Sequence, residues 1–287
     1  MRADGKLVKD VSPMYLIAPY FMRERCDAQN MIEISANYDN VHNYVIAKRK
    51  EGKKISHMAV VVAAYVRTLS QHKCLNRFVI HNRIYAHKDL SMAMVVLRPG
   101  DGNETMGKVK FDIADTVFDI NDKIEKYVAE SSAADSKNGL DKVLNFFVRI
   151  PILVRFVIWF LRTIDKFGLL PGALIDASPF HETMVFTNLA SIKTNHILHH
   201  VYNFGTCNLI LAMGNTVETP KKVNGQIELV KEIPFGLVMD ERIADGHYFA
   251  QSFADFKKYL TNPELLETPP ETLDIDYPFP TLSSRFP

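Results

Sequence analysis

The stretch Gly236–Glu264, GLVMDERIADGHYFAQSFADFKKYLTNPE, decides the fold. Its first residues are apolar and predict a buried strand that ends near Asp240. From Asp245 onward apolar residues recur three and four positions apart, which predicts an amphipathic helix. A charged turn, DERIADG, separates the two elements and places several ionisable side chains at the end of the strand.

Working outward, the rest of the chain mixes strand and helix signals. Alternation predicts a strand over Met31–Asp39, and Val41–Lys54 predicts a short helix that Gly52 ends. Ser56 is the predicted N-cap of an almost wholly apolar helix that reaches His72.

The middle of the chain gives further elements. The segments Arg77–His87 and Leu90–Leu97 predict two strands paired as a hairpin, and Phe118–Ser131 predicts a helix with Asp119 or Asn121 near its cap. More strand signals follow in TMVFTNL, CNLILAMGN and IELVKEIPFGLVMD. Because strands and helices do not alternate strictly, we expect an α/β protein with a mixed sheet.

Composition narrows the class of protein. The chain has 287 residues, 47% of them apolar, and a formal net charge of +1, which gives no electrostatic reason to expect nucleic acid as a partner. Three cysteines far apart in the sequence predict reduced thiols rather than disulfides or a metal knuckle. The charged first residues lack a secretory signal, so we expect a cytoplasmic protein.

The chain divides into three parts. Residues 1–12 predict a flexible or loosely docked N-terminal arm. Residues 13–268 form the predicted domain, with an apolar helical insertion at about 140–172. Residues 269–287 are a proline-rich tail that is unsuited to helix or to the centre of a sheet.

The insertion includes the apolar segment Leu144–Pro171. A membrane-spanning helix needs about 20 predominantly apolar residues, and several arginines interrupt this one. Arg155, Arg162 and Lys166 fall on one helical stripe, with aromatic residues over much of the rest. The segment therefore packs on the protein or a partner subunit, lies in a membrane interface, or forms a mobile lid, and the sequence leaves these alternatives open.

The motif Asp240-Glu241-Arg242-Ile243-Ala244-Asp245-Gly246 resembles the D-H-R-x-x-D-G signature of the dihydrolipoyl acyltransferase catalytic domain of 2-oxoacid dehydrogenases and of chloramphenicol acetyltransferase. Both aspartates, the arginine and the glycine match, and Glu241 stands where the family has its catalytic histidine. The resemblance covers about residues 13–268 and implies a two-layer sandwich of the chloramphenicol acetyltransferase type.

The resemblance also implies roles for other residues. The segment that begins VFTNLASIK places Thr187 where the family has a hydroxyl that hydrogen-bonds the oxyanion. Arg25, from the first helical region, is implied to form a structural ion pair with the motif aspartate Asp245. In the family the site lies in a channel between subunits of a trimer, and trimers can build larger cages.

Glutamate in the histidine position changes the expected chemistry. Acyl transfer from a CoA thioester needs a base, and a solvated carboxylate has a pKa about two units below that of imidazole. Burial could raise the pKa of Glu241 and recover basicity, or Glu241 could simply pair with Arg242 or another cation at an inactive site.

Histidines offer a substitute base. His196, His199 and His200 share one face if their segment is helical. Without a carboxylate or cysteine partner in the pattern they are weak candidates for zinc, so we expect no metal.

The resemblance implies a free-standing CoA-dependent acyltransferase homologue that acylates a small molecule or a lipoyl group on another protein. Because the resemblance begins almost at the start of the chain, we expect no lipoyl group of its own. The alternatives are a catalytically inactive trimeric scaffold and a protein that contacts membranes peripherally through residues 144–171.

Overall fold

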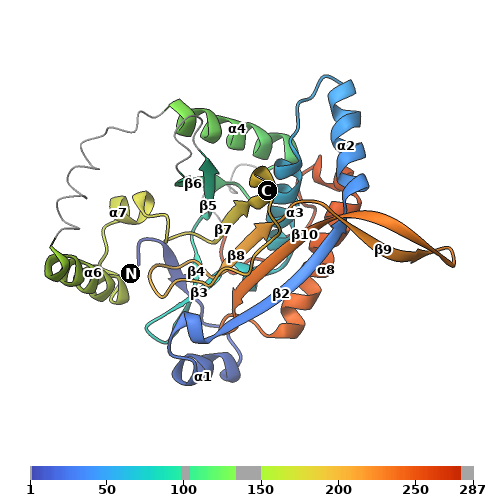
Figure 1. Ribbon diagram of the computed structural model, residues 1–287. Helices are drawn as coiled ribbons and strands as arrows, with labels where there is room; N and C mark the ends of the chain where they lie inside the picture. Colours follow the sequence, from blue (N-terminus) through green and yellow to red (C-terminus); the bar gives the residue numbers. More distant parts are fainter. Residues whose placement is uncertain (1, 98–103, 134–149, 279–287) are drawn as a thin grey trace.

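The computed structural model describes residues 2–97, 104–133 and 150–278. Its centre is a seven-stranded sheet with helices packed against one face (Figure 1). The predicted α/β class with a mixed sheet is confirmed.

The sheet combines antiparallel and parallel neighbours. Strand β7 runs parallel to both β5 and β8, whereas the pairs β5–β6, β8–β10 and β10–β2 are antiparallel. A further strand, β9, pairs with the first half of β10 and forms the ribbon that projects from the body in Figure 1. In spatial order the strands are β2 (Gln29–Asn37), β10 (Gln226–Asp240), β8 (Leu209–Met213), β7 (Met184–Asn188), β5 (Leu90–Leu97) and β6 (Glu104–Phe111), with β9 at Val217–Val223.

The main helices bury the apolar stripes that their sequences predict. In α3 the hydroxyl of Ser56 accepts a hydrogen bond from the amide of Ala59 at 3.0 Å, so the predicted cap is confirmed. Phe235 of β10 meets Phe256 of α8 edge to face in the core, at a ring distance of 5.5 Å. The helices are α1 (Pro13–Phe21), α2 (Tyr38–Lys50), α3 (His57–Gln71), α4 (Val117–Ala133), α6 (Pro151–Lys166), α7 (Gly172–Ala177) and α8 (Gly246–Thr261).

A second, three-stranded sheet corrects one prediction. The segment Arg77–His87 forms a hairpin by itself, β3 (Arg77–Ile80) with β4 (Arg83–His87), and β4 also pairs with β1 (Gly5–Leu7). The predicted hairpin between Arg77–His87 and Leu90–Leu97 is wrong, because β5 joins the large sheet and pairs with β6. The tight turn at His81 and Asn82 has positive φ angles of 49° and 56°. Such a turn suits a two-residue hairpin.

Both ends of the described chain are docked. Arg2 and Asp4 are buried and ion-paired, so the expectation of a flexible or loosely docked arm is wrong for these residues. In the tail, Asp276 receives two hydrogen bonds from Arg77, each 2.7 Å long.

The apolar insertion contains the single described helix α6. Only Asp165 of this helix is buried, while Ile152, Phe156 and Trp159 are well exposed. Residues 144–149 of the predicted segment lie outside the described residues. None of the described helices is long and apolar enough to cross a membrane.

The two faces of the large sheet have different coverings. Leu211, Phe235 and Leu237 belong to the core under the helices. The intervening side chains of Ile210 and Val238 pack on the opposite face with Val201 and other residues of a smaller cluster. The segment between β7 and β8 therefore covers the second face, on which Thr187 also lies.

Candidate active site

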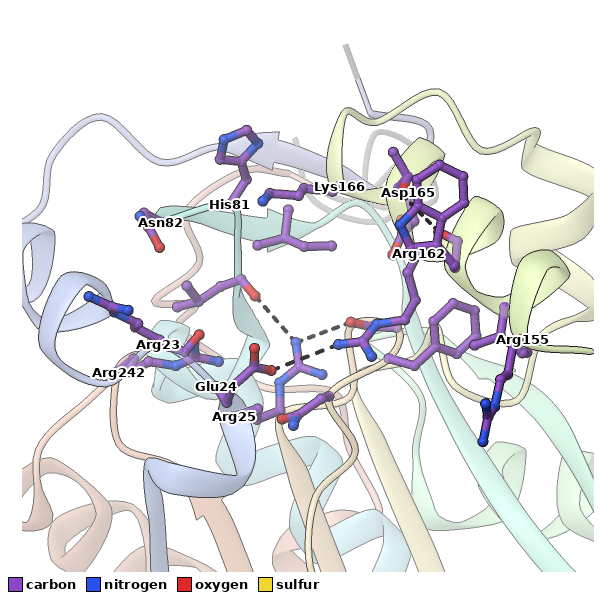
Figure 2. A pocket seen from close by; sticks show the side chains of 18 of the residues that line it. Arg23, Glu24, Arg25, His81, Asn82, Arg155, Arg162, Asp165, Lys166 and Arg242 are labelled. Atoms are coloured by element: carbon purple, nitrogen blue, oxygen red, sulfur yellow. Dashed lines mark hydrogen bonds and ion pairs between the residues drawn. The ribbon is translucent and has the colours of Figure 1, made fainter. Parts of the chain in front are cut away.

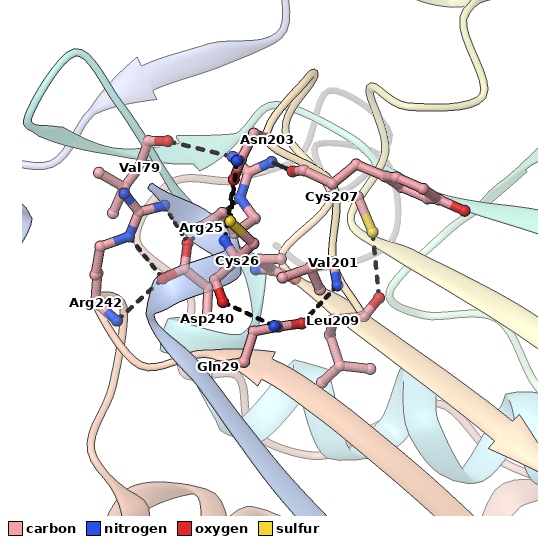
Figure 3. A network of polar contacts seen from close by, with 12 residues as sticks. Arg25, Cys26, Gln29, Val79, Val201, Asn203, Cys207, Leu209, Asp240 and Arg242 are labelled. Carbon is pink, nitrogen blue, oxygen red and sulfur yellow. Dashed lines mark hydrogen bonds and ion pairs between the residues drawn. The ribbon is translucent and has the colours of Figure 1, made fainter. Parts of the chain in front are cut away.

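The motif turn is held by a buried carboxylate. Asp240 is fully buried at the end of β10 and accepts hydrogen bonds from Arg242, from Nε at 2.8 Å and from Nη2 at 2.7 Å. Arg25 approaches the same carboxylate, with 3.4 Å between its Nε and Oδ2 of Asp240 (Figure 3). The predicted Arg25–Asp245 ion pair is thus wrong in its acidic partner, which is Asp240.

Arg25 also connects three parts of the chain. Its guanidinium donates to the carbonyl oxygens of Tyr202 at 2.8 Å, Gly205 at 3.1 Å and Val79 at 3.3 Å. A buried charge is tolerated when it is paired and hydrogen-bonded in this way. The network therefore fixes the strand end against the loop before β8 and the hairpin β3–β4.

Glu241 is presented by this rigid turn. Its backbone amide donates to the carbonyl of Ala28 at 2.7 Å, and its side chain is partly exposed. Within the described residues no ion pair or hydrogen bond of the Glu241 carboxylate is formed. Because Arg242 is committed to Asp240, the interpretation of Glu241 as the ion-pair partner of Arg242 is wrong.

Asp245 has a local structural role. Its carboxylate accepts a hydrogen bond from the amide of Tyr248 at 2.8 Å and so caps α8, while its own amide donates to the hydroxyl of Tyr15 at 3.1 Å. The backbone hydrogen bond from Tyr248 is the main cause that lowers the pKa of Asp245. The exposed position at a helix N-terminus explains why this aspartate has no need of a buried arginine.

Thr187 lies far from Glu241 within one chain. It is buried in β7, and the strand register aligns it with Ala212 of β8 and, through that residue, with Gly236 of β10. Glu241 follows Gly236 by five residues, which at about 3.3 Å per residue is about 16 Å along the strand. Thr187 and Glu241 of the same chain therefore cannot act on one small reacting group.

His196 lies on the same face as Thr187. Its Nε2 is 3.3 Å from Oε1 of Glu33 on β2, and its Nδ1 is buried with no partner among the described residues. A Cβ at Gly236 would lie 2.6 Å from the carbonyl oxygen of Ile197, so glycine permits this close crossing of the sheet. The register places Glu33 and Gly236 opposite each other. His196 therefore lies over a row of paired residues that crosses the sheet from Glu33 through Gly236 and Ala212 to Thr187.

The predicted histidines His199 and His200 do not share a helical face with His196. The segment around His196, His199 and His200 is irregular rather than helical, so the expected common helical face is not formed. His200 contacts Tyr202 edge to face, with 5.8 Å between ring centres. No group of residues suited to hold a metal occurs in the part of the chain that the structure describes.

Two features escaped the prediction from sequence. A cavity of about 620 Å³ lies between α6 and the motif turn. Glu182 is fully buried, both of its carboxylate oxygens lack a hydrogen-bond partner among the described residues, and burial raises its pKa to about 9. The sequence could not predict that α6 lies near Arg242, because more than 70 positions separate the helix from this residue.

Comparisons with known proteins agree with this architecture. Residues 183–268 match the family model of the 2-oxoacid dehydrogenases acyltransferase catalytic domain. No curated protein sequence matches the chain.

Among solved structures, a probable dihydrolipoamide acetyltransferase from Listeria monocytogenes 4b F2365 is 14% identical with a TM-score of 0.58, covering 88% of this chain and 93% of that one. The dihydrolipoamide acetyltransferase of Azotobacter vinelandii is 12% identical with a TM-score of 0.59, covering 90% and 93%. A chloramphenicol acetyltransferase is 10% identical with a TM-score of 0.55, covering 89% and 99%.

The mixed sheet, the helix layer and the strand-end turn together define a protein with the chloramphenicol acetyltransferase-like fold. Within that class, the chain resembles the catalytic domain of the 2-oxoacid dehydrogenase acyltransferases, as the sequence motif predicted. This chain has the carboxylate of Glu241 at the position of the histidine in the D-H-R-x-x-D-G motif.

Proposed function

We propose that the protein is a CoA-dependent acyltransferase homologue that acts between protomers of a homotrimer, with Glu241 in the base position. The observation that carries this proposal is the side chain of Glu241, which the Asp240 network holds at the strand end without a partner in the described chain.

The expected reaction is acyl transfer from an acyl-CoA thioester. The acceptor attacks the thioester carbon and loses its proton to a base, and the C–S bond then breaks to release CoA as a thiol. A hydroxyl such as that of Thr187 would donate to the oxyanion. Because Thr187 and Glu241 are far apart in one chain, the two groups would come from neighbouring protomers.

His196 is the candidate for a substitute base. Glu33 can orient its ring through Nε2, as a carboxylate does for a catalytic imidazole, and the buried Nδ1 has no partner among the described residues. The position of His196 over the row that contains Thr187 supports this role. The acceptor is a small molecule or a lipoyl group on another protein.

The experiment compares the wild-type protein with E241H, E241Q and H196Q. Each variant is incubated with acyl-CoA donors of several chain lengths and several acceptors, and released thiol is measured. Loss of activity in E241Q alone assigns the base to Glu241, and loss in H196Q alone assigns it to His196.

The rival function is an inactive trimeric scaffold. If the wild-type protein releases no thiol above buffer but E241H does, the acyl-transfer channel has survived and only the base has been lost. If neither releases thiol with any donor, the acyltransferase proposal is wrong. Analytical ultracentrifugation of the same samples tests the trimer.

A further inference from the structure

The cavity between α6 and the motif turn is walled by elements from distant parts of the sequence. Helix α6 forms one wall, and the other combines the segment after α1, the β3–β4 turn and the loop at 203–205 (Figure 2). An exposed ion pair, with 3.8 Å between Arg162 and Glu24, reaches from one wall to the other. The volume of about 620 Å³ lies in the range of sites that hold small molecules.

Positive charge predominates around this cavity. Six of its lining side chains are cationic and only Glu24 and Asp165 are acidic. The cationic residues are Arg23, Arg25, Arg155, Arg162, Lys166 and Arg242.

Glu24 lies near Arg162, but the remaining acids do not neutralise the other cations. Arg25 and Arg242 share the single carboxylate of Asp240, so this cluster retains positive charge. Asp165 is engaged by Arg2 and His181 outside the cavity. Among the described residues, Lys166 forms no ion pair, and Figure 2 shows it at the same end of the cavity as His81, on the opposite wall.

The same cavity has an apolar side. Val154, Ile158 and Trp159 line it from α6, and Phe204 and Ile80 line it from the opposite wall. Ile158 is 45% exposed and Trp159 is 61% exposed, so apolar surface remains for a ligand to cover. Burial of such surface is favourable by about 25 cal/mol per Å².

We propose that this cavity binds an amphiphile that has an anionic phosphate or carboxylate head and an apolar chain. The head lies among Arg162, Lys166 and Arg23, which can donate charge-assisted hydrogen bonds. The chain lies along Ile158 and Trp159. A simple inorganic anion would leave the apolar wall unused, and a neutral apolar molecule would leave the cations unpaired.

Trp159 is the only tryptophan of the chain, so its fluorescence reports directly on the cavity. The protein is titrated with dodecyl phosphate below the concentration at which it forms micelles. We expect a saturable shift of Trp159 emission to shorter wavelength with unchanged circular dichroism. Dodecanol has only the apolar chain and inorganic phosphate has only the anionic head, so each should bind much more weakly than dodecyl phosphate.

The variant R162Q/K166Q should bind dodecyl phosphate about tenfold more weakly, as expected for the loss of charge-assisted hydrogen bonds. The matched control K222Q/K231Q removes two exposed lysines of the β9–β10 ribbon and should bind like the wild-type protein. This readout does not require turnover, so its result is independent of the acyltransferase proposal.

Three outcomes with the soluble ligands would overturn the inference. They are equal binding of dodecanol and dodecyl phosphate, unchanged binding by R162Q/K166Q, and an emission shift that occurs only with loss of helical signal. Vesicles of phosphatidylglycerol distinguish a bilayer from a single amphiphile. A shift with vesicles alone would assign the exposed face of α6 to membrane contact instead of ligand binding.

Discussion

Arg2 and Asp165 form a buried ion pair, with 2.7 Å between Nη2 and Oδ1, although 163 positions separate them in the sequence. Asp4 binds the same guanidinium at 2.9 Å, and His181 lies 3.3 Å from Asp165. This cluster attaches the C-terminal end of α6 to the body, while most of the helix stays exposed. It therefore sets the position of one wall of the basic cavity.

The substitution R2A should leave the carboxylates of Asp4 and Asp165 without their shared cation. Removal of one partner of a buried pair costs about 3–5 kcal/mol, and we expect a loss of about 3 kcal/mol in the free energy of unfolding. Urea unfolding followed by circular dichroism measures it. The exposed K222Q substitution serves as control, and an R2A protein as stable as K222Q would contradict the predicted role.

The substitution E182Q should stabilise the protein at neutral and alkaline pH. Burial raises the pKa of Glu182 from 4.5 to about 9 in the folded state. Between these values the unfolded chain is ionised while the folded chain retains the proton, so stability falls as pH rises through this window. Glutamine removes that loss, at most about 1.4 kcal/mol per pH unit.

Urea unfolding of both proteins at pH 5 and pH 8 tests this prediction. The advantage of E182Q should be larger at pH 8 than at pH 5. An advantage that is the same at both values would show that the Glu182 carboxyl does not titrate as proposed.

His87 should make the protein less stable in acid. Burial lowers its pKa from 6.5 to about 4, so below pH 6.5 the unfolded chain takes up a proton that the folded chain does not. Stability therefore falls as pH decreases from 6.5 to 4. The variant H87Q should lose less stability over this range than the wild-type protein, measured by thermal unfolding at pH 7 and pH 4.5. Equal losses would contradict the assignment.

The cap of α8 gives a smaller, local prediction. The variant D245A should lose about 1 kcal/mol of stability, because the amide of Tyr248 loses its acceptor, whereas D245N should keep most of it. Thermal unfolding compares the two. If D245N were as destabilised as D245A, charge rather than capping would be the important property of Asp245.

Short-range patterns predicted much of the fold. Ser56 and the apolar run after it predicted α3, and the sequence after Asp245 predicted α8, because caps and helical periodicity are local properties. The hairpin within Arg77–His87 was missed, although both residues of its turn, His81 and Asn82, are types that adopt positive φ angles more readily than most.

The candidate site was less accessible to such reasoning. The motif identified Glu241, Arg242 and Asp245, but the choice of Asp240 as the partner of Arg25 depends on residues 215 positions apart. Burial decides this choice, because Asp240 is enclosed at the strand end whereas Asp245 faces solvent. The family pattern predicted which residues gather at the turn, and only the three-dimensional arrangement decides which of them pair.

Because Gly236 has no side chain, the backbone at Ile197 can approach the sheet closely at this position. The distance between His196 and Glu33 consequently depends on the absence of a Cβ atom at Gly236 of β10, the strand beside β2. A methyl group at position 236 would raise the crossing segment and separate the imidazole from its carboxylate, without altering any ionisable side chain. The smallest residue of β10 thus governs the alignment of an imidazole that belongs to another part of the chain.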